Sequence, residues 1–446
     1  MKIAFVTLGC KLNYAETSTY ERGVRAAGLE VVPWRDKADV YLVNTCTVTE
    51  TANAKSRSEI RKLHRINPAA PIVVTGCYAQ MKPDEVAAID GVARVFRSDE
   101  KSLVVSETLS LLGGCGESAP SGVRFAHPTI PSGRSPRYRS AGDTSLRGSS
   151  PSAATSTFSA YSSGERTRSF LKVQDGCDNF CAYCTVPYAR GRSRNIPVCE
   201  AVRMAQEIAA QGVKEIVLTG VNTGDFGRTT GESFLDLLKA LNEVQGIERY
   251  RISSIEPNLL TEEIVDWIAS GTKFQPHFHI PLQTGCDELL KRMGRRYTTA
   301  EFAGKLQMIR SKMEKPGAEK VFFGIDVMVG LPGETPELFA QTCSFLERIR
   351  PAFIHIFPYS KRPGTRAAEM PDQVPESIKK ERVATLEALC DRLHREFEEA
   401  NRGIHARVLW ESKEKDGSMG GYTGNYIRIT RPYDAQLSGR ITEITI

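Results

Sequence analysis

The central half of the chain alternates between short apolar runs and longer amphipathic stretches. The apolar runs predict six β-strands, at residues 170–175, 215–219, 250–254, 277–282, 321–329 and 353–357. The amphipathic stretches predict helices between them, at residues 198–211, 234–244, 260–270, 300–312 and 336–348. Because strands that alternate with helices pair in parallel through right-handed crossovers, this pattern predicts a partial (β/α)6 barrel.

The first hundred residues show a related pattern. Three apolar runs there each end in a cysteine, namely Cys10, Cys46 and Cys77, and residues 52–66 read as a helix. Continuous apolar runs suit strands that are buried on both faces. They predict an open parallel α/β sheet whose C-terminal edge, where ligands bind in such folds, carries three cysteines. The alternative is that each cysteine is an ordinary small buried hydrophobic residue.

The C-terminal part changes character. Residues 377–400 read as a long helix, and strand-like segments with glycine turns follow at residues 406–410, 421–429 and 437–446. Short strands separated by such turns predict a small antiparallel β-barrel. The predicted fold class is therefore α/β, with an N-terminal open parallel sheet, a central partial barrel and a C-terminal antiparallel barrel.

One motif carries most of the chemistry. Cys177, Cys181 and Cys184 have C-x3-C-x2-C spacing directly after the first strand of the predicted barrel. Three thiolates on one loop can hold three irons of a [4Fe-4S] cluster and leave the fourth iron open. A structural zinc site would need a fourth closing ligand, and a disulfide would leave one thiol over. The spacing favours the cluster over zinc or incidental cysteines.

With Tyr183 as the aromatic residue before the last cysteine, the motif resembles that of the radical S-adenosylmethionine (SAM) superfamily. The resemblance implies that the open iron binds SAM and that the cluster supplies one electron to cleave it. It also implies that glycine-rich turns after the barrel strands surround SAM, since loops at the C-terminal ends of such strands form the active site. The residues expected to contact SAM are Tyr183, Gly220, Asn222, Gln283, Met328 and Gly330.

The N-terminal cysteines carry a second resemblance. Residues 7–13 read Thr-Leu-Gly-Cys-Lys-Leu-Asn and residues 44–49 read Asn-Thr-Cys-Thr-Val-Thr. These phrases resemble the methylthiotransferases, and most closely the bacterial branch that modifies threonylcarbamoyladenosine in tRNA. The resemblance implies an auxiliary [4Fe-4S] cluster on Cys10, Cys46 and Cys77. The Tyr-Gly-Cys-Gln-Met-Asn phrase of the isopentenyladenosine branch and the Leu-Gly-Cys-Pro-Lys-Asn phrase of the ribosomal-protein branch are both absent.

The resemblance implies a specific reaction. N6-threonylcarbamoyladenosine at position 37 of tRNA would gain a methylthio group at C2, with one SAM methylating a cluster-bound sulfur and a second initiating radical C–H cleavage. Both cysteine triads would be catalytic. The expected partners are the tRNA anticodon stem-loop, an electron donor such as flavodoxin or ferredoxin, and a sulfur source. The alternatives are a methylthiotransferase acting on isopentenyladenosine or on a ribosomal protein aspartate, and a binding module with structural zincs.

Four segments are expected. Residues 1–112 form the N-terminal methylthiotransferase domain, 113–165 a flexible linker, 166–396 the radical SAM core and 397–446 a domain resembling the small RNA-binding TRAM domain. Residues 119–164 contain 26 Gly, Ser, Thr or Pro among 46, too little apolar surface to offset ordering entropy. The last segment balances seven basic against seven acidic residues, so its RNA role follows from the resemblance, with Trp410 and Tyr422 either stacking on RNA or lying in the core.

Charge and compartment add further expectations. The net charge of +6 is mild for 446 residues, so local basic clusters matter more. Three such clusters are present: Lys55, Arg57, Arg61, Lys62 and Arg65 form the first, Arg190, Arg192 and Arg194 the second, and Lys291, Arg292, Arg295 and Arg296 the third. Each cluster either contacts phosphate or belongs to a solvated helix face.

The chain shows neither a signal peptide nor an apolar span of membrane length. We therefore expect a monomeric cytoplasmic protein without a membrane partner, whose eleven cysteines serve metal chemistry in a reducing compartment. The cysteines without ligand spacing are interpreted as ordinary thiols: Cys115, Cys199, Cys286, Cys343 and Cys390.

Overall fold

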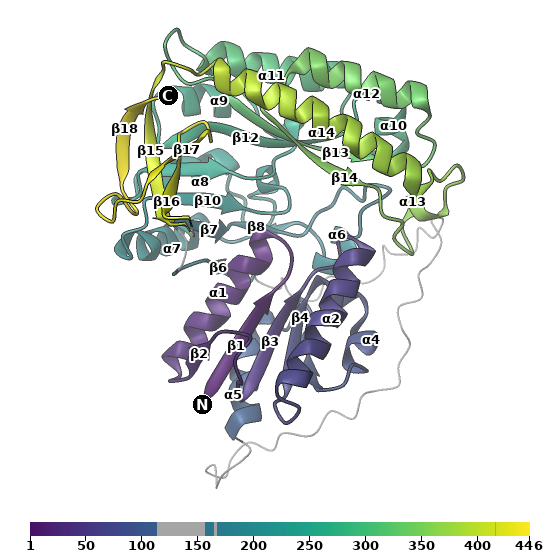
Figure 1. The fold of residues 1–446 in the computed structure, drawn as a ribbon, viewed down its shortest axis with the longest axis vertical. Helices are drawn as coiled ribbons and strands as arrows, with labels where there is room; N and C mark the ends of the chain where they lie inside the picture. Colours follow the sequence, from purple (N-terminus) through teal and green to yellow (C-terminus); the bar gives the residue numbers. More distant parts are fainter. Residues whose placement is uncertain (114–156, 165–166, 415) are drawn as a thin grey trace.

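Three β-sheets and one short ribbon organise the computed structural model, which describes residues 1–113, 157–164, 167–414 and 416–446 (Figure 1). The sheets follow one another along the chain. The first two are mainly parallel and the third is antiparallel. This arrangement confirms the α/β fold class. No helix in the described part of the chain is long and apolar enough to cross a membrane.

The N-terminal domain is a parallel sheet with strand order β2-β1-β3-β4-β5. Its strands are β1 (Lys2–Thr7), β2 (Glu30–Val32), β3 (Val40–Thr45), β4 (Ile72–Gly76) and β5 (Val92–Val95). Every residue of β3 and β4 is buried, as the continuous apolar runs predicted. One face packs against α1 (Lys11–Ala26) and α5 (Val104–Gly113), and the other against α2 (Glu50–Ile66), α3 (Cys77–Met81) and α4 (Pro83–Ala87). A short 3-10 helix, η1 (Lys101–Leu103), precedes α5.

The central domain is a seven-stranded sheet with order β14-β13-β12-β11-β10-β7-β6. All six predicted strands are present and parallel: β7 (Arg168–Lys172), β10 (Glu215–Thr219), β11 (Arg249–Ile252), β12 (Phe274–Gln283), β13 (Phe322–Val329) and β14 (Phe353–Pro358). The predicted helices lie between them, and with the long helix after β14 they cover the outer face: α7 (Val198–Ala210), α8 (Phe234–Asn242), α9 (Glu262–Ala269), α11 (Thr299–Met313), α12 (Pro336–Ile349) and α14 (Glu376–Glu399).

Shorter elements complete this domain at the C-terminal ends of the strands. They are the ribbon β8 (Gln174–Asp175) with β9 (Arg194–Asn195), the helices α6 (Val186–Arg190), α10 (Asp287–Arg292) and α13 (Arg366–Glu369), and the 3-10 turns η3 (Thr223–Asp225) and η4 (Pro257–Leu259). Loops at this end of parallel strands form active sites in barrel folds.

The predicted linker ends earlier than expected. Strand β6 (Ala160–Tyr161) pairs antiparallel with β7, and the hydroxyl of Ser162 accepts a hydrogen bond of 2.8 Å from the backbone N–H of Phe170. The ring of Phe158 lies 5.3 Å from that of Tyr20 in α1. Ala160–Tyr161, which the sequence assigned to the linker, therefore form an edge strand of the central sheet. Gly113 of the predicted linker ends α5, and residues 114–156, with Cys115, and residue 165 lie outside the described residues.

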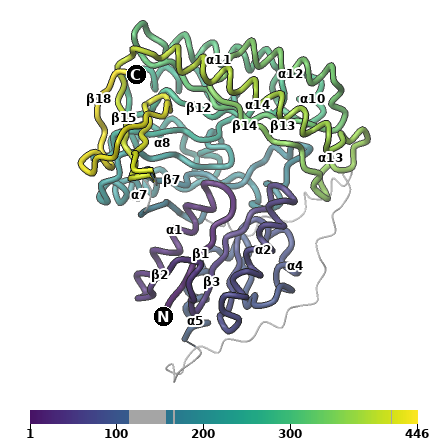
Figure 2. Tube along the Cα trace, in the orientation of Figure 1, coloured from purple at the N-terminus to yellow at the C-terminus, as the bar shows by residue number. Residues whose placement is uncertain are grey.

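The N-terminal and central domains pack directly against each other. Helix α1 contacts both β6 and β7, so the N-terminal domain meets the edge of the central sheet (Figure 2). The guanidinium of Arg22 in α1 donates a 2.9 Å hydrogen bond to the carbonyl of Tyr161 and stacks over its ring at 3.7 Å. The short strand β6 therefore belongs to the interface between the domains.

The C-terminal sheet has the order β17-β16-β15-β18 and the form of an antiparallel half-barrel. Its strands are β15 (His405–Lys413), β16 (Ser418–Tyr422), β17 (Arg428–Pro432) and β18 (Ile441–Thr445). Trp410 is 1% exposed and donates through Nε1 to the hydroxyl of Thr442 at 2.8 Å. This residue is therefore a core residue, and its predicted alternative of stacking on RNA is wrong.

Residues 422–426, which read Tyr-Thr-Gly-Asn-Tyr, dock the C-terminal domain onto the central sheet. Arg251 of β11 donates to the carbonyls of Thr423 at 2.8 Å and Gly424 at 2.7 Å. Arg168 of β7 donates to the hydroxyl of Tyr426 at 2.8 Å and lies 4.7 Å above the ring of Tyr422. The phrase therefore closes the N-terminal end of the central strands, and its aromatic rings are engaged there rather than presented to RNA.

Candidate active site

The loop between β8 and α6 carries Cys177, Cys181 and Cys184, all free thiols. Each sulfur receives a hydrogen bond: Cys177 from the N–H of Asn179 at 3.5 Å, Cys181 from Arg295 at 3.2 Å and Cys184 from the N–H of Val186 at 3.4 Å. Donors aimed at sulfur stabilise the thiolate form and tune a bound cluster. This loop therefore fits three thiolate ligands.

The loop folds this way because Gly176 precedes it. Gly176 has φ +73°, and a Cβ there would lie 2.0 Å from the carbonyl oxygen of Arg192. Only glycine adopts this conformation without a clash. The close approach lets the N–H of Cys177 donate to the carbonyl of Gly191 at 3.1 Å, which anchors the first ligand.

The environment of these thiols is suited to a metal rather than to free cysteine. Burial, with a smaller contribution from the neighbouring Cys181, raises the pKa of Cys177 to about 11 and that of Cys184 to about 12. Thiols must lose their protons to bind iron, and the positive charge of bound iron offsets the cost of burying thiolates. Three close thiols, of which two are buried and Cys184 is half-buried, therefore fit a cluster better than they fit a role as core residues.

The second triad comes from three neighbouring strands. Cys46 follows β3, Cys77 follows β4, and Cys10 follows β1 by one short turn. Burial raises the pKa of Cys77 to about 11, with Arg190 opposing the rise and Cys10 and Cys46 adding to it. A Cβ on Gly9 would lie 3.2 Å from the sulfur of Cys46. The three thiols therefore converge at one edge of the sheet, as the sequence predicted.

Asn13 connects the two triads through a contact that sequence reasoning missed. Its side-chain N–H groups donate to the carbonyls of Leu8 and Thr45, both at 2.9 Å, which ties the turn before Cys10 to the residue before Cys46. Its side-chain oxygen accepts a hydrogen bond from Arg190, which lies six residues after Cys184. One arginine of the central domain therefore braces the auxiliary triad.

A buried charge network lies beneath these contacts. Glu16 of α1 contacts Lys101 at 2.8 Å, Lys172 at 2.7 Å and Arg190 at 3.2 Å, and Asp175 contacts Lys172 at 2.6 Å and Arg190 at 3.0 Å. Burial raises the pKa of Glu16, but Lys101, Lys172 and Arg190 outweigh burial and hold the pKa well below its usual range. The network joins both domains and fixes the position of one triad relative to the other.

Replacing Glu16 by glutamine should destabilise the protein strongly, because the change leaves three buried cations with one carboxylate fewer. Breaking a buried ion pair typically costs about 3 to 5 kcal/mol. We expect a clearly lower Tm in thermal unfolding. Glu21→Gln, which removes an exposed ion pair with Arg25, should change the Tm little. Equal Tm values for the two variants would show that the buried network around Glu16 does not stabilise the protein.

The same network predicts a pH dependence. Because the pKa of Glu16 is lower in the folded protein than in the unfolded chain, its contribution to stability is complete above the unfolded-state pKa. It is lost as the pH falls through the folded-state pKa. The Tm of the wild type should therefore fall more steeply than that of Glu16→Gln as the pH is lowered from 5 into the acid range, and parallel curves would contradict this expectation.

Five of the six residues predicted to contact SAM lie at the C-terminal ends of β10, β12 and β13, and Tyr183 lies on the cysteine loop. Tyr183 and Met328 pack on one apolar cluster with Met293, Leu331, Tyr359 and Ala367. Gln283 and Gly330 both have φ +74° at the ends of β12 and β13. Gly220 and Asn222 form the turn after β10, where Asn222 donates to Asp225 at 3.1 Å. Their contact with SAM remains a prediction.

Several polar residues of this edge were missed. Gln174 accepts from the N–H groups of Val221 at 2.9 Å and Asn222 at 3.0 Å, and Arg295 pairs with Glu256 at 2.8 Å as well as with the sulfur of Cys181. Arg295 was instead grouped with candidates for phosphate contact. The burial of the Arg295 side chain excludes contact with phosphate. The only sequence signal for its place beside the cysteine loop is that it follows the fourth predicted strand.

The predicted basic helix is partly neutralised. Arg57 contacts Glu85 at 2.9 Å and Glu50 at 3.4 Å, and Lys62 contacts Glu59 at 3.0 Å. Lys55 and Arg61 are exposed, and neither forms an ion pair within the described residues. A phosphate contact from α2 would therefore come from Lys55 and Arg61 rather than from Arg57.

Comparison with known proteins agrees with this geometry. Residues 171–346 match the radical SAM superfamily, and residues 2–97 match the uncharacterized protein family UPF0004. The structure of a radical SAM methyltransferase, TsrM, from Kitasatospora setae, with cobalamin and a [4Fe-4S] cluster bound, covers 82% of this chain and 77% of its own with a TM-score of 0.54 and 16% identity. The fold is therefore that of radical SAM enzymes, which use a [4Fe-4S] cluster and SAM.

Relatives that align with nearly the whole chain identify the family within the radical SAM enzymes. The threonylcarbamoyladenosine tRNA methylthiotransferase MtaB of Bacillus subtilis is 37% identical over 100% of this chain and 93% of its own, and that of Aquifex aeolicus is 36% identical over 97% of both. A tRNA-2-methylthio-N(6)-dimethylallyladenosine synthase of Wolbachia is 33% identical over 93% of this chain and 89% of its own. The chain belongs to the radical SAM tRNA methylthiotransferase family.

Proposed function

We propose that this enzyme converts N6-threonylcarbamoyladenosine at position 37 of tRNA to its 2-methylthio derivative. The observation that carries the proposal is the pair of cysteine triads, one on each domain, joined through Asn13, Arg190 and the buried network around Glu16. The relatives named for this nucleoside support the choice of substrate. The branches acting on isopentenyladenosine or on a ribosomal protein aspartate are the alternatives.

Each triad has a separate task. Cys177, Cys181 and Cys184 would hold the cluster that binds SAM, and Cys10, Cys46 and Cys77 would hold the auxiliary cluster. With both clusters and SAM bound, the site gains one-electron chemistry and a sulfur to donate. Such chemistry is needed because an aromatic C–H has no acidic proton for general acid–base catalysis to remove.

The chain's own residues position and insulate this chemistry. The Arg295 guanidinium offsets negative charge at Cys181, and the N–H groups of Asn179 and Val186 stabilise negative charge on the other two sulfurs by hydrogen bonds. Arg190 holds Asn13 against the turns of Cys10 and Cys46. The docked C-terminal domain covers the opposite end of the strands. The substrate base would therefore enter from the edge between the two cysteine triads.

The proposal includes partners. The substrate is the tRNA anticodon stem-loop, an electron donor such as flavodoxin or ferredoxin reduces the cluster, and a separate sulfur source supplies the transferred atom. We propose that the enzyme acts as a monomer in the cytoplasm. The TRAM-like domain would contribute to RNA binding through residues other than Trp410 and Tyr426, which are engaged within the protein.

The test is a reaction of the reconstituted enzyme with SAM, a reductant and tRNA that carries threonylcarbamoyladenosine, followed by mass spectrometry of the digested nucleosides. The proposal predicts the 2-methylthio nucleoside in place of its precursor. Methylthiolation of isopentenyladenosine in a parallel tRNA, with no reaction on threonylcarbamoyladenosine, would favour the alternative branch instead.

Helix α2 gives a separate prediction on tRNA binding. Replacing Lys55 and Arg61 together by alanine should raise the Kd for tRNA and reduce its salt dependence, because phosphate contacts release counterions. Fluorescence anisotropy at several salt concentrations measures both effects. Arg57→Ala should change the salt slope less, since Arg57 is already paired with two acids; an equal effect of Arg57→Ala would contradict this interpretation.

A further inference from the structure

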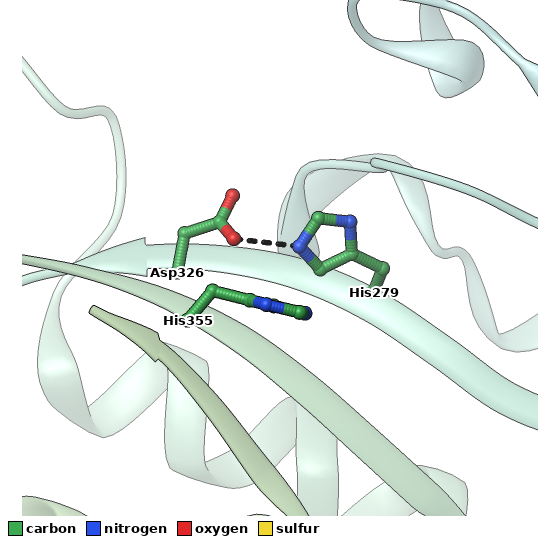
Figure 3. A group of neighbouring side chains, drawn as sticks. All are labelled: His279, Asp326 and His355. Atoms are coloured by element: carbon green, nitrogen blue, oxygen red, sulfur yellow. Dashed lines mark hydrogen bonds and ion pairs between the residues drawn. The ribbon is translucent and has the colours of Figure 1, made fainter. Parts of the chain in front are cut away.

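Three polar side chains meet on the inner face of the central sheet. His279 on β12, Asp326 on β13 and His355 on β14 lie side by side with their functional atoms within 4.8 Å of one another (Figure 3). The Nε2 atom of His279 lies 2.7 Å from Asp326, and the rings of His279 and His355 are 5.1 Å apart. Neither the cysteine triads nor the network around Glu16 uses this group.

The strand register explains their position. Residues alternate between faces along a strand, and Phe278, Ile280, Ile325, Val327 and Ile354 pack into the apolar core beneath the outer helices. The intervening residues therefore point away from that core, toward the interior that the helices do not fill. His279 and Asp326 are half-buried and His355 is exposed, so this polar group remains accessible from the interior.

Lys11 reaches the same space from the other domain. It is the first residue of α1 and directly follows Cys10. Its side chain is exposed, yet it lies close enough to Asp326 and His355 to interact with both electrostatically. Within the described residues its ammonium forms no ion pair at salt-bridge distance, although Asp326 lies nearby. A free cation of the auxiliary domain therefore faces the polar group of the central sheet.

This arrangement suits an anion better than a metal ion. Two histidines and a carboxylate are a known metal-ligand set, but His279 already directs Nε2 at Asp326. The ammonium of Lys11 adds a positive charge to the interior, whereas Arg168 and Arg251, which also interact with it electrostatically, are themselves paired with Glu411 at 2.7 Å and Glu215 at 2.9 Å. A carboxylate placed there would gain a charge-assisted hydrogen bond from the Lys11 ammonium.

We propose that Lys11, together with His355, binds the carboxylate of the threonylcarbamoyl group on the substrate base. The proposal rests on the proposed function. C2 and C6 of adenine flank the same ring nitrogen, N1, so a substituent on N6 that is turned toward N1 extends along the side of the base on which C2 lies. A residue adjacent to a ligand of the auxiliary cluster is therefore within reach of that substituent when C2 faces the cluster.

The site also gives a basis for selectivity. An isopentenyl group carries no charge, and it would leave the Lys11 ammonium desolvated without a partner. Leaving a charged donor unpaired costs more than losing a neutral hydrogen bond. Lys11 would thus favour the threonylcarbamoyl nucleoside because its ammonium attracts the carboxylate. It would disfavour the isopentenyl nucleoside because the ammonium would be buried without a counter-charge from the substrate.

The test compares two anticodon stem-loop RNAs, one with threonylcarbamoyladenosine and one in which an amide replaces its carboxylate. Binding is measured by fluorescence anisotropy with the cluster-reconstituted protein, without reductant. The wild type should bind the carboxylate RNA about tenfold more tightly, the size expected for one hydrogen bond to a charged group. Lys11→Gln should bind both RNAs equally, and Lys11→Arg should restore part of the preference.

Matched variants and outcomes separate the possible failures. Lys239→Gln, an equal charge change on the exposed face of α8, should keep the wild-type preference, and all variants should hold equal iron. If the wild type methylthiolates the carboxylate RNA but binds both RNAs equally, the assignment of the carboxylate site to Lys11 is overturned, while the proposed function stands. A preference for the carboxylate RNA that survives Lys11→Gln would overturn the same assignment. A divalent metal ion that is lost with His279→Ala would also overturn it. Absence of methylthiolation would overturn the proposed function.

Discussion

Replacing Cys181 by alanine should abolish formation of 5′-deoxyadenosine from SAM and remove roughly half of the protein's iron, because three-cysteine ligation leaves no spare ligand. Cys181 is buried, is flanked by both other thiols of its triad and receives a hydrogen bond from Arg295. No alternative sulfur is available on the loop. Chromatography of the SAM products and iron analysis of anaerobically purified protein measure the two effects.

Cys199→Ala provides the control. Cys199 is an exposed thiol on α7, fifteen residues after Cys184 in the chain, and its loss should leave iron content and SAM cleavage unchanged. Wild-type SAM cleavage by Cys181→Ala, or by a variant lacking all three cysteines of the loop, would show that this triad does not hold the SAM-cleaving cluster.

Replacing Cys46 by alanine should leave SAM cleavage intact, unlike the replacement of Cys181. Methylthio transfer to tRNA should disappear while reductive cleavage of SAM remains, because Cys46 lies on the N-terminal domain and contributes nothing to the loop of Cys177. The variant should again lose roughly half of its iron, as expected for one of two three-cysteine clusters. Nucleoside mass spectrometry and the yield of 5′-deoxyadenosine separate the two activities.

Cys343→Ala is the appropriate comparison for that variant, because Cys343 is a half-buried thiol outside both triads and its replacement should leave both activities intact. Full methylthio transfer by Cys46→Ala would mean that the N-terminal cysteines are ordinary buried thiols after all, which was the alternative left open by the sequence.

The sequence predicted the parallel strands because their apolar runs are continuous, and the structure buries β3, β4 and β10 completely. Both cysteine triads were also predictable. One triad is local in sequence, and the other follows from the rule that parallel strands present their C-terminal ends at one edge. These features depend on periodicity and spacing, which a single sequence displays.

The contacts between domains could not be predicted in this way. Arg190 and Asn13 are 177 residues apart in the chain, and Glu16 and Lys172 are 156 residues apart. Separations of this size lie far outside any local sequence motif. The only sequence signal was a polar set of residues, including Asn13 and Glu16, on the buried side of α1. From the sequence alone, such polar residues predict a solvent-exposed helix face, because the charged residues that pair with them belong to a distant part of the chain.

Two further errors have a shared cause. Strand β6 was missed because two residues within a Ser-rich segment carry no periodicity. Stacking on RNA was one of two roles predicted for Tyr422, but Arg168 lies 4.7 Å above its ring within the protein. In both cases the partner lies in a distant part of the chain. Composition alone does not distinguish a surface for RNA from a surface for another domain.

The most direct measurement uses tRNA that carries threonylcarbamoyladenosine with deuterium at C2. If both triads act on one base, the 5′-deoxyadenosine formed during turnover should contain deuterium, and the same nucleoside should acquire a methylthio group at C2. Mass spectrometry of both products from one reaction gives the answer. Methylthio product without deuterium transfer, or deuterium transfer that persists unchanged when the substrate carries isopentenyladenosine instead, would contradict the account.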